Sequence, residues 1–375
     1  MKILMVHNEY GAMSGEEAVF RSYVDAIKLK YDVRKYVVES SKTPVSFFDK
    51  VRSFFSGIFS IKCFFEFYSK VTSDSIDIVH FHNIYPWISV SAVVAAKLGG
   101  AKVVFTLHNF KHICPSSTLT RQGEPYFESL KYGERYTVYN NVQDDYFKSI
   151  GYYLRFKSEK LFGLSKIVDR FIHVSDAQKK IYTDYNDEWS KSIVIPNFIT
   201  NEDSARYFAN QKLQRKNGVP RVCFVGRLTR EKGLDNFLSI AKNCTSTEFF
   251  LIGEGEVNIN QNNVKVIGKL DKVDLFRTLL DMDYVISCPT TFETFSLSSL
   301  EALCCGCKVV LSNKVGLEMY KEETDRIFNV DNMSTLSDDF FYFNLEQTKT
   351  VGVPSFASQD KFLEKIVELY EGVLK

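Results

Sequence analysis

Short apolar runs alternate with longer amphipathic stretches along most of this 375-residue chain. The runs are rich in Val, Ile and Phe, which favour strands, and the stretches between them have the apolar spacing of helices. Such alternation predicts βα units, whose strands lie parallel in a sheet covered by helices. The pattern ends near residue 195 and restarts at 221, after a polar stretch at 200–218 without a strand signal. The sequence therefore predicts two α/β domains, each doubly wound.

The same patterns predict the individual elements. In the first half, strands are expected at 2–6, 33–38, 76–81, 102–107, 170–174 and 192–195, and helices at 15–30, 87–98, 150–165 and 176–185. In the second half, strands are expected at 221–225, 248–252, 264–267, 284–287 and 308–311, and helices at 233–243, 272–281, 298–304 and 359–374. Residues 116–150 are polar and Tyr-rich and predict a long loop or short helices. Two such domains leave a cleft at the carboxyl ends of their strands, where ligands of such folds bind.

Charge and composition exclude several classes of protein. Lys and Arg number 47 and Asp and Glu 46, a net charge of +1, so no overall positive field attracts nucleic acid. No uninterrupted apolar stretch reaches the roughly 18 residues that a membrane span needs. The first residues, MKILMVHN, have an apolar run too short for a signal peptide and predict a strand. The eight cysteines form no regular disulfide framework, so we expect a protein of the reducing cytosol.

A basic loop follows the strand at 221–225, in the string GRLTREKG at 226–233. Gly226 allows a sharp turn, and Arg227, Arg230 and Lys232 arrive together at the carboxyl end of the strand. A guanidinium fork beside an ammonium group suits a diphosphate. A solvated basic loop preceding a helix is the alternative interpretation.

Two glutamates lie in the string TFETFSLSSLEALCCG at 291–306. Glu293 is expected in the loop after the strand at 284–287, and Glu301 inside the helix that follows. The apolar neighbours of Glu301 predict that this helix is largely buried, and a buried carboxylate needs a partner. A carboxylate that accepts hydrogen bonds from sugar hydroxyls would be apt here; solvent exposure is the alternative for a lone Glu.

A small-residue turn precedes the first expected helix. Gly11 and the pair Ser14-Gly15 lead from the first strand into Glu16 and Glu17. Such a turn exposes backbone N–H groups at a helix N-terminus to an anion. The two glutamates already satisfy the helix dipole, so an ordinary capped helix start explains the pattern as well.

Four histidines raise a metal-site hypothesis. His80 and His82 alternate on one strand and share a face, and His108 and His112 would share a face on a helix. Together, HxH and HxxxH resemble the ligands of a metallohydrolase. Residue 109 is Asn, so the base of an HExxH motif is missing, and His108 directly follows a strand; both facts disfavour this hypothesis.

Three further strings have simpler interpretations. Cys304-Cys305-Gly306-Cys307 lacks the second CxxC of a zinc ribbon and is interpreted as small core residues. Asp281-Met282-Asp283 spells DxD, which can hold a divalent cation, but it is interpreted as a turn before a strand. Gly253-Glu254-Gly255 is a glycine turn without the third glycine of a dinucleotide fingerprint.

In their order and spacing, these motifs resemble those of the family 4 glycosyltransferases, retaining enzymes of the GT-B fold that use nucleotide-sugar donors. The resemblance covers nearly the whole chain. It rests on SGE at 14–16, DIVHFHN at 77–83, FTLHNFKHICP at 105–115, IPN at 195–197, GRLTREKG at 226–233, and Glu293 and Glu301 followed by Ala-Leu-Cys-Cys-Gly. The HN…CP combination with the Glu pair is similar to enzymes that build bacterial surface polysaccharides.

The resemblance implies an architecture. An N-terminal acceptor-side Rossmann-like domain is expected at 1–198, and a C-terminal donor-binding Rossmann-like domain at 199–358. The two face a central cleft, and the helix at 359–375 returns to the N-terminal domain.

The resemblance also implies roles for single residues. The implied ligands are Arg227 and Lys232 for the donor diphosphate, Glu301 for the ribose, Glu293 for the donor sugar, the backbone N–H groups of Ser296 and Leu297 for the sugar or phosphate, His108 beside the donor sugar, and Gly15 in the loop that closes on the diphosphate. The sequence departs from the family at Ser14, Thr294 and Ser296, which stand where glycines are usual. A side chain at 296 lies close to the expected donor, and so bears on which donor is used.

The implied mechanism needs no metal and no other cofactor. Arg227 and Lys232 would stabilise the departing nucleotide diphosphate, and the acceptor hydroxyl would lose its proton to the departing phosphate. The expected acceptor is a lipid-linked glycan at the cytoplasmic face of a membrane. A non-catalytic GT-B partner subunit and a nucleotide-sugar epimerase or hydrolase are the alternatives.

The segment 44–70 is unusually aromatic. Phe47, Val51, Phe54, Ile58 and Phe65 fall close to one helical stripe, and basic residues lie between them. The simpler interpretation is a helix that packs this stripe on the sheet. The stripe is wider than one packing face requires, so we also expect peripheral docking on the inner leaflet of a membrane.

Overall fold

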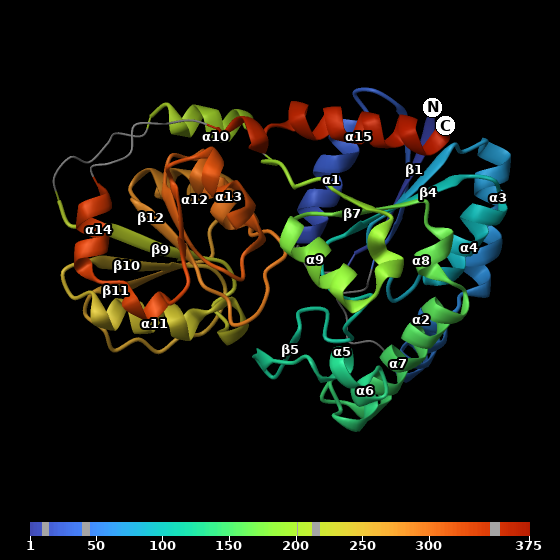
Figure 1. The fold of residues 1–375 in the computed structure, drawn as a ribbon, viewed down its shortest axis with the longest axis horizontal. Helices are drawn as coiled ribbons and strands as arrows, with labels where there is room; N and C mark the ends of the chain where they lie inside the picture. The colour runs from blue at the N-terminus through green and yellow to red at the C-terminus, as the bar shows by residue number, and fades with distance from the viewer. Residues whose placement is uncertain (10–14, 40–45, 201, 212–217, 346–352) are drawn as a thin grey trace. The chain divides into compact units, whose positions relative to one another are not determined.

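The computed structural model describes residues 1–9, 15–39, 46–200, 202–211, 218–345 and 353–375, which divide into two compact units. Unit 1 comprises Met1–Arg121, Tyr126–Pro196 and Leu363–Lys375, and unit 2 comprises Gln122–Pro125 and Asn197–Phe362. Each unit is built on a six-stranded parallel sheet (Figure 1). Two parallel sheets with helical connections confirm the predicted α/β fold with two doubly wound domains.

The sheet of unit 1 has the strand order β2-β1-β3-β4-β7-β8. Its strands are β1 (Lys2–Asn8), β2 (Asp32–Val38), β3 (Ile78–Phe81), β4 (Lys102–Leu107), β7 (Arg170–His173) and β8 (Ser192–Val194). The order reverses between β1 and β3, which makes this the switch point of the sheet, where such folds bind ligands. The carboxyl ends of β1, β3 and β4 are neighbours. Asn8 at the end of β1 and Asn83 just after β3 are therefore hydrogen-bonded, although they are 75 residues apart in the sequence.

The connections of unit 1 are mostly helical. The longer helices are α1 (Gly15–Ile27), α2 (Phe47–Ile58), α3 (Ile61–Asp74), α4 (Val90–Leu98), α7 (Tyr146–Leu161) and α9 (Asp176–Tyr185). Serine side chains cap four of them: Ser46 accepts from Asp49 N, Ser60 from Cys63 N, Ser89 from Ser91 N and Ser175 from Gln178 N. Each cap satisfies an amide that has no partner inside the helix, which is why these helices begin where they do.

Residues 116–150 form short elements, as predicted. A small hairpin pairs β5 (Thr120–Arg121) with β6 (Glu124–Pro125), and the helices α5 (Glu128–Tyr132) and α6 (Tyr136–Tyr139) follow. The helix α8 (Leu164–Ile167) then leads from α7 into β7.

The aromatic segment forms two helices, and only the second packs as the simpler interpretation expects. In α3, the Phe67 ring lies 5.9 Å from the Phe81 ring of β3, so this helix packs on the sheet. In α2, the Phe54 ring stacks 4.5 Å from the Phe147 ring of α7, and Ser158 Oγ of α7 donates to the Ile58 carbonyl at 2.6 Å. Phe54 of the α2 stripe therefore packs on a helix rather than on the sheet. Residues 44 and 45 lie outside the described residues.

The sheet of unit 2 has the strand order β11-β10-β9-β12-β13-β14. Its strands are β9 (Arg221–Val225), β10 (Glu248–Ile252), β11 (Val264–Gly268), β12 (Tyr284–Ser287), β13 (Lys308–Ser312) and β14 (Ile327–Val330). The predicted helices are present as α11 (Leu234–Asn243), α12 (Lys272–Leu280) and α13 (Leu297–Cys304). Its switch point lies between β9 and β12, so the loops after these two strands meet at one edge.

Two α-helices and one strand of unit 2 were not predicted. They are the helix α10 (Glu202–Ala209), the edge strand β14 and the helix α14 (Asp338–Leu345). The helices are only eight residues long, and each buries few apolar side chains, such as Phe208 in α10 and Phe341 in α14. Such short patterns carry too little periodicity to be read from the sequence.

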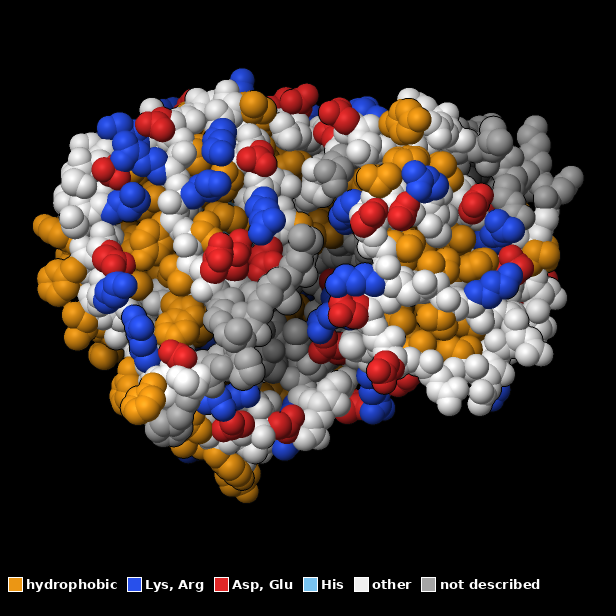
Figure 2. Space-filling view, turned by 180° about the vertical axis from the view of Figure 1, so that it is seen from behind, with side chains coloured by type: hydrophobic (Ala, Val, Ile, Leu, Met, Phe, Trp, Pro, Cys, Tyr) orange, Lys and Arg blue, Asp and Glu red, His pale blue; other side chains and the backbone are white. Residues whose placement is uncertain are grey.

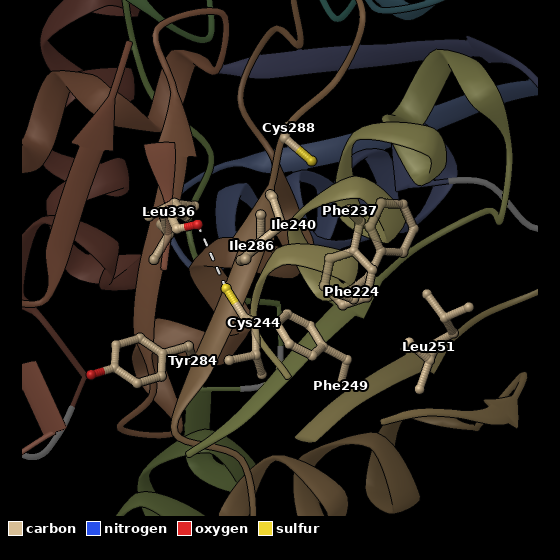
Figure 3. Close-up of a cluster of buried hydrophobic side chains, with 14 of the residues drawn as sticks. Phe224, Phe237, Ile240, Cys244, Phe249, Leu251, Tyr284, Ile286, Cys288 and Leu336 are labelled. Atoms are coloured by element: carbon tan, nitrogen blue, oxygen red, sulfur yellow. Dashed lines mark hydrogen bonds between the residues drawn. The ribbon is translucent and has the colours of Figure 1, made fainter. Parts of the chain in front are cut away.

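Aromatic residues fill the core of unit 2 (Figure 3). The Phe237 ring lies 5.6 Å from Phe224 and 5.4 Å from Phe249, with all three side chains buried. The Tyr284 hydroxyl donates to the Phe341 carbonyl at 2.8 Å, which satisfies its one polar group. The cysteines at 304, 305 and 307 are buried free thiols, as their interpretation as core residues requires.

The last helix, α15 (Gln359–Leu374), passes from unit 2 into unit 1. Its residues from Leu363 onward belong to unit 1, where Tyr370 Oη lies 2.6 Å from His80 Nδ1 on β3. The division between the units falls after Pro196 and inside α15, compared with the expected boundaries at 198 and 358.

Candidate functional site

The loops after β9 and β12 pack tightly against each other at the switch point of unit 2. Gly233 has φ +90°, and a Cβ there would lie 1.9 Å from the Cys288 carbonyl oxygen. Thr290 N also donates to the Glu231 carbonyl at 3.1 Å. Only glycine fits position 233, because any side chain would meet the backbone of the other loop. The two loops that carry the predicted ligands are therefore held in one arrangement.

This packing joins Lys232 to Glu293. Lys232 Nζ lies 2.5 Å from Glu293 Oε2, and both side chains are about one third exposed or less. The backbone of Glu293 is itself fixed, because its N–H donates to the Lys314 carbonyl and its carbonyl accepts from Gly316 N, both at 2.9 Å. Two residues predicted separately thus form one ion pair. A carboxylate and an ammonium group so placed can accept from a hydroxyl and pair with an anion of the same ligand.

The other basic residues of the loop are engaged elsewhere. Arg227 is 61% exposed and its guanidinium lies 2.6 Å from the Glu231 carboxylate. Arg230 pairs with Glu124 at 2.6 Å and with Asp235 at 3.3 Å. Of the predicted diphosphate ligands, Lys232 is therefore directed at Glu293, whereas Arg227 is directed along its own loop.

The helix α13 begins at a strained residue. Ser296 has φ +72° and ψ +81°, a left-handed conformation that favours glycine, and it is buried. Its Oγ donates to Ser299 Oγ at 2.8 Å, so its hydroxyl does not cap the helix. The turn that the family builds with glycine is thus kept here with a side chain, directly before Leu297, the first residue of α13.

Glu301 has the partner that a buried carboxylate needs. Its side chain is 5% exposed and forms an ion pair with Lys272 Nζ, on the first residue of α12. The sequence did not identify Lys272 as the partner of Glu301. The contact between α12 and α13 depends on the order of the strands in the sheet, which the sequence does not give. The only signal for Lys272 was the requirement that Glu301 be paired.

The DxD string at 281–283 and the glycine turn at 253–255 have structural explanations. Asp283 Oδ2 accepts from Arg221 N at 2.8 Å at the start of β9, the sheet edge opposite the site, so DxD forms a turn as predicted. A Cβ at Gly253 would lie 1.7 Å from the Gly226 carbonyl oxygen, so this glycine lets the loops after β9 and β10 approach. Both strings therefore serve packing at the ends of strands.

In unit 1, the four histidines of the metal-site hypothesis do not converge. His82 Nδ1 lies 2.7 Å from His108 Nε2, whereas His112 Nδ1 lies 3.1 Å from Glu159 Oε2. His80 bonds to Tyr370 and, through Nε2, to Thr106 Oγ1 at 2.7 Å. Among the described residues, no three His, Cys, Asp or Glu side chains are grouped so as to hold a metal ion.

Burial keeps the histidines in this part of unit 1 uncharged. It lowers the pKa of His108 and of His80 to about 3, and the pKa of His7 to about 4. The pKa of His82 is also held well below its ordinary value, mainly by burial. His108 is thus an uncharged imidazole at pH 7, suited to donating or accepting a hydrogen bond rather than to pairing with an anion.

Asparagines extend this polar cluster at the same sheet edge. Asn83 Nδ2 donates to the Asn8 carbonyl at 2.7 Å, and Asn109 Nδ2 donates to Glu16 Oε2 at 3.2 Å. Lys111 is 6% exposed and donates to Asn83 Oδ1 at 3.2 Å. Burial lowers the pKa of Lys111 to about 8, an effect that Glu16 partly offsets.

The sequence contained a signal for this cluster that was missed. A His-Asn pair occurs at the end of three strands that are adjacent in the sheet, at residues 7–8, 82–83 and 108–109. A dipeptide repeated at three neighbouring strand ends predicts a shared polar edge, as found. Gly15 is the exposed first residue of α1, and Ser14 lies outside the described residues.

Two family models match the chain. The model described as Glycosyltransferase Family 4 matches residues 30–203, and the model described as Glycosyl transferases group 1 matches residues 219–339. Together they cover most of both units. The chain therefore contains a glycosyltransferase family 4 domain followed by a glycosyl transferases group 1 domain.

Two relatives of this chain are distant in sequence. A 42.6 kDa protein of the cps region of Klebsiella pneumoniae is 28% identical over 69% of this chain and 63% of its own length. A 41.2 kDa protein of the same region is 24% identical over 64% of this chain and 61% of its own length. The chain thus aligns with less than two thirds of each relative.

Solved structures share the GT-B glycosyltransferase fold. A glycosyltransferase of Rickettsia africae superposes with a TM-score of 0.63 at 16% identity, over 100% of this chain and 98% of its own. The HepE protein of Anabaena, solved in complex with UDP, superposes with a TM-score of 0.62 at 15% identity, over 99% of this chain and 100% of its own. The fold predicted from the resemblance is therefore confirmed.

Proposed function

We propose that this glycosyltransferase is a retaining enzyme that transfers a sugar from a nucleotide-diphosphate-sugar to a hydroxyl of a lipid-linked glycan during surface polysaccharide synthesis. The observation that carries the proposal is the Lys232–Glu293 pair at the switch point of unit 2, with the buried, paired Glu301 in the next helix. These groups have the charges and hydrogen-bonding capacity that a diphosphate, a sugar and a ribose require. The UDP bound by HepE of Anabaena supports a nucleotide ligand.

The proposed chemistry is electrostatic. Departure of the nucleotide diphosphate develops negative charge, which Lys232 would stabilise. The exposed Arg227 would join it by exchanging its Glu231 partner for phosphate. The first amides of α13, at Leu297 and beyond, carry no side-chain cap and can donate to the same phosphate or to the sugar. Glu293 would accept from a hydroxyl of the donor sugar. No step of this scheme calls on a metal ion.

Retention of configuration follows if the acceptor attacks on the face that the diphosphate leaves. The departing phosphate then accepts the proton of the acceptor hydroxyl, so no protein base is needed. His108 is neutral and would donate a hydrogen bond to the donor sugar, which positions it without taking up a proton. The cps-region relatives support a surface glycan as the acceptor.

Donor binding tests this function first. We expect one of UDP-, GDP- or ADP-sugars to raise the unfolding temperature, since a ligand at 100 times its dissociation constant stabilises by about 2.7 kcal/mol. With the donor identified, radiolabelled sugar should appear in an organic-extractable glycolipid, and NMR should show that its anomeric configuration is kept. Donor consumption without transfer to any acceptor would support a hydrolase or epimerase instead. Absence of donor binding would support a partner subunit.

We also propose that α2 and its neighbours dock on an anionic membrane surface. In α2, Phe48 is 82% and Phe55 is 63% exposed, on the side that α7 leaves uncovered, and the basic Lys50 and Arg52 lie between them. Figure 2 shows hydrophobic side chains gathered along the lower left edge of unit 1, where α2, α3, α6 and α7 lie. Exposed aromatic rings with interspersed basic groups suit a lipid headgroup region. No described helix is long and apolar enough to cross a bilayer.

Vesicle co-sedimentation tests this surface. We expect the protein to pellet with phosphatidylglycerol vesicles, and a Phe48→Ser/Phe55→Ser variant to remain in the supernatant. Phe54 is left intact because it packs on Phe147. The matched control is Leu29→Ser/Leu98→Ser, which removes two apolar side chains that are 66% and 64% exposed outside these helices. Equal pelleting of both variants, or wild type that stays in the supernatant, would contradict the docking surface.

A further inference from the structure

His82 and His108 form a direct contact at the carboxyl ends of β3 and β4. Their rings are nearly parallel, with an interplanar angle of 21° and centroids 5.0 Å apart. The distance between His82 Nδ1 and His108 Nε2 is 2.7 Å, which is a hydrogen bond between the two imidazoles. Because both rings are neutral at pH 7, one nitrogen of the pair must carry the proton and the other must accept it.

The surroundings of His82 determine which ring donates. His82 is 3% exposed, and its Nε2 has no hydrogen-bond partner among the described residues. Phe20 and Tyr23 stand edge-on to the His82 ring, with centroids at 5.1 and 5.2 Å, so much of its environment is aromatic. A buried N–H without an acceptor is rarer than an unpaired lone pair. The proton of His82 therefore belongs on Nδ1, where His108 accepts it.

The tautomer of His108 follows. A neutral imidazole carries one N–H, and Nε2 of His108 is occupied as the acceptor. Its own proton must then sit on Nδ1. His108 is partly exposed, unlike His82, so it is the member of the pair that a ligand can reach.

We propose that His82 is a positioning residue that fixes the ring orientation and the tautomer of His108, so that His108 offers Nδ1–H as a donor and cannot accept a proton at Nε2. The identity of the group that receives this hydrogen bond, an oxygen of the sugar donor, rests on the proposed function. The tautomer itself does not. His82 thus acts through His108 and not on the substrate.

His80 supplies a matched control on the same strand. It is as buried as His82, but both of its nitrogens are used elsewhere, with Tyr370 Oη at 2.6 Å and Thr106 Oγ1 at 2.7 Å. Its substitution perturbs the same strand end without removing the hydrogen bond to His108. An effect on His108 that appears in a His82 variant and not in the equal His80 variant is therefore specific.

The first test is NMR of the protein labelled with 15N-histidine, in which only six residues contribute signals. We expect the wild type to show His108 protonated at Nδ1. A His82→Leu variant should show a shift of this proton toward Nε2, and His80→Leu should leave it in place. His82→Asn should restore the wild-type tautomer, because the Asn amide can donate from nearly the position of Nδ1. Protonation of wild-type His108 at Nε2, or an unchanged tautomer in His82→Leu, would overturn the proposal.

The second test is kinetic. We expect His82→Leu to lower kcat on the order of 10²-fold with KM nearly unchanged, the result of losing one preorganised contact in the transition state. His82→Asn should recover most of kcat, and His80→Leu should retain kcat while sharing any loss of stability. A KM effect alone would contradict the positioning role. If no assay detects sugar transfer by the wild type, the proposed function is refuted, whereas the NMR result still decides the tautomer.

Discussion

Lys232 Nζ lies 2.5 Å from Glu293 Oε2, across 61 residues of sequence, where the loops after β9 and β12 meet. The ion pair is only partly exposed, so a ligand that enters must satisfy both charges at once. A phosphate oxygen can take over the ammonium and a sugar hydroxyl the carboxylate, as long as the two groups belong to one molecule. The spacing of the two charges therefore restricts which ligands fit, in addition to supplying charge.

Lys232→Ala should lower kcat/KM for the donor about 10²- to 10³-fold, because it removes the preorganised charge that, in the proposed function, stabilises the leaving group. Steady-state kinetics measures this, and circular dichroism must show an unchanged fold. The matched control is Lys265→Ala. This lysine lies on the edge strand β11, its side chain is 60% exposed, and it pairs with Glu248 of β10. Near-normal turnover of Lys232→Ala would contradict its assignment to the donor.

Glu301→Ala should lower kcat/KM for the donor to a similar degree. Lys272→Ala should lower the free energy of unfolding. Removal of Lys272 leaves the buried Glu301 carboxylate unpaired, at a cost of about 1–3 kcal/mol in the free energy of unfolding. Urea titration measures it. Lys272→Ala/Glu301→Gln should regain most of that stability without regaining donor use, because the neutral amide no longer needs a counter-charge. A double variant as unstable as Lys272→Ala would contradict this explanation.

Acid should destabilise unit 1 through its buried histidines. The pKa of His173 is lowered to about 3, mainly by burial, so the unfolded chain binds a proton between pH 6.5 and 3 that the folded chain does not. The free energy of unfolding therefore falls as the pH drops through this window, and is fully present above pH 6.5. Between pH 7.5 and pH 5, the free energy of unfolding of His173→Leu should fall by about 2 kcal/mol less than that of the wild type. Urea titration at both pH values measures this. Parallel losses in the two proteins would show that His173 protonates in the folded state.

Ser296→Gly should change the free energy of unfolding by less than about 1 kcal/mol. Glycine removes a left-handed strain of about 1–2 kcal/mol but also loses the hydrogen bond to Ser299 and gains freedom in the unfolded chain. Ser296→Val should instead cost several kcal/mol, because β-branched residues tolerate this conformation worst. If both variants were equally stable in thermal unfolding, the positive φ at this position would be wrong.

Excess EDTA should leave the rate of sugar transfer unchanged. In the proposed function Lys232 and Arg227 supply the positive charge for the leaving group, and Asp283 is engaged at the opposite edge of the sheet by Arg221 N. Turnover assayed with and without chelator, after dialysis against it, measures this. A loss that manganese restores would contradict the proposed source of charge.

The sequence by itself determined the βα alternation, all but one of the strands of the two six-stranded sheets and the existence of a paired, buried Glu301. Strand propensity, helical spacing and turn glycines are local properties that survive in any tertiary context. The gathering of the candidate site residues at one edge of each sheet also followed, since the carboxyl ends of parallel strands must share one edge.

Tertiary structure alone decided which of these residues meet. Lys232, rather than Arg227, faces Glu293 because Gly233 seats its loop on the Cys288 carbonyl. The contact of His82 with His108 exists because β4 lies beside β3. Phe54 of α2 packs on Phe147 because the chain returns beside α2 as α7. Such contacts depend on strand order and on chain reversals across tens of residues, which no local pattern encodes.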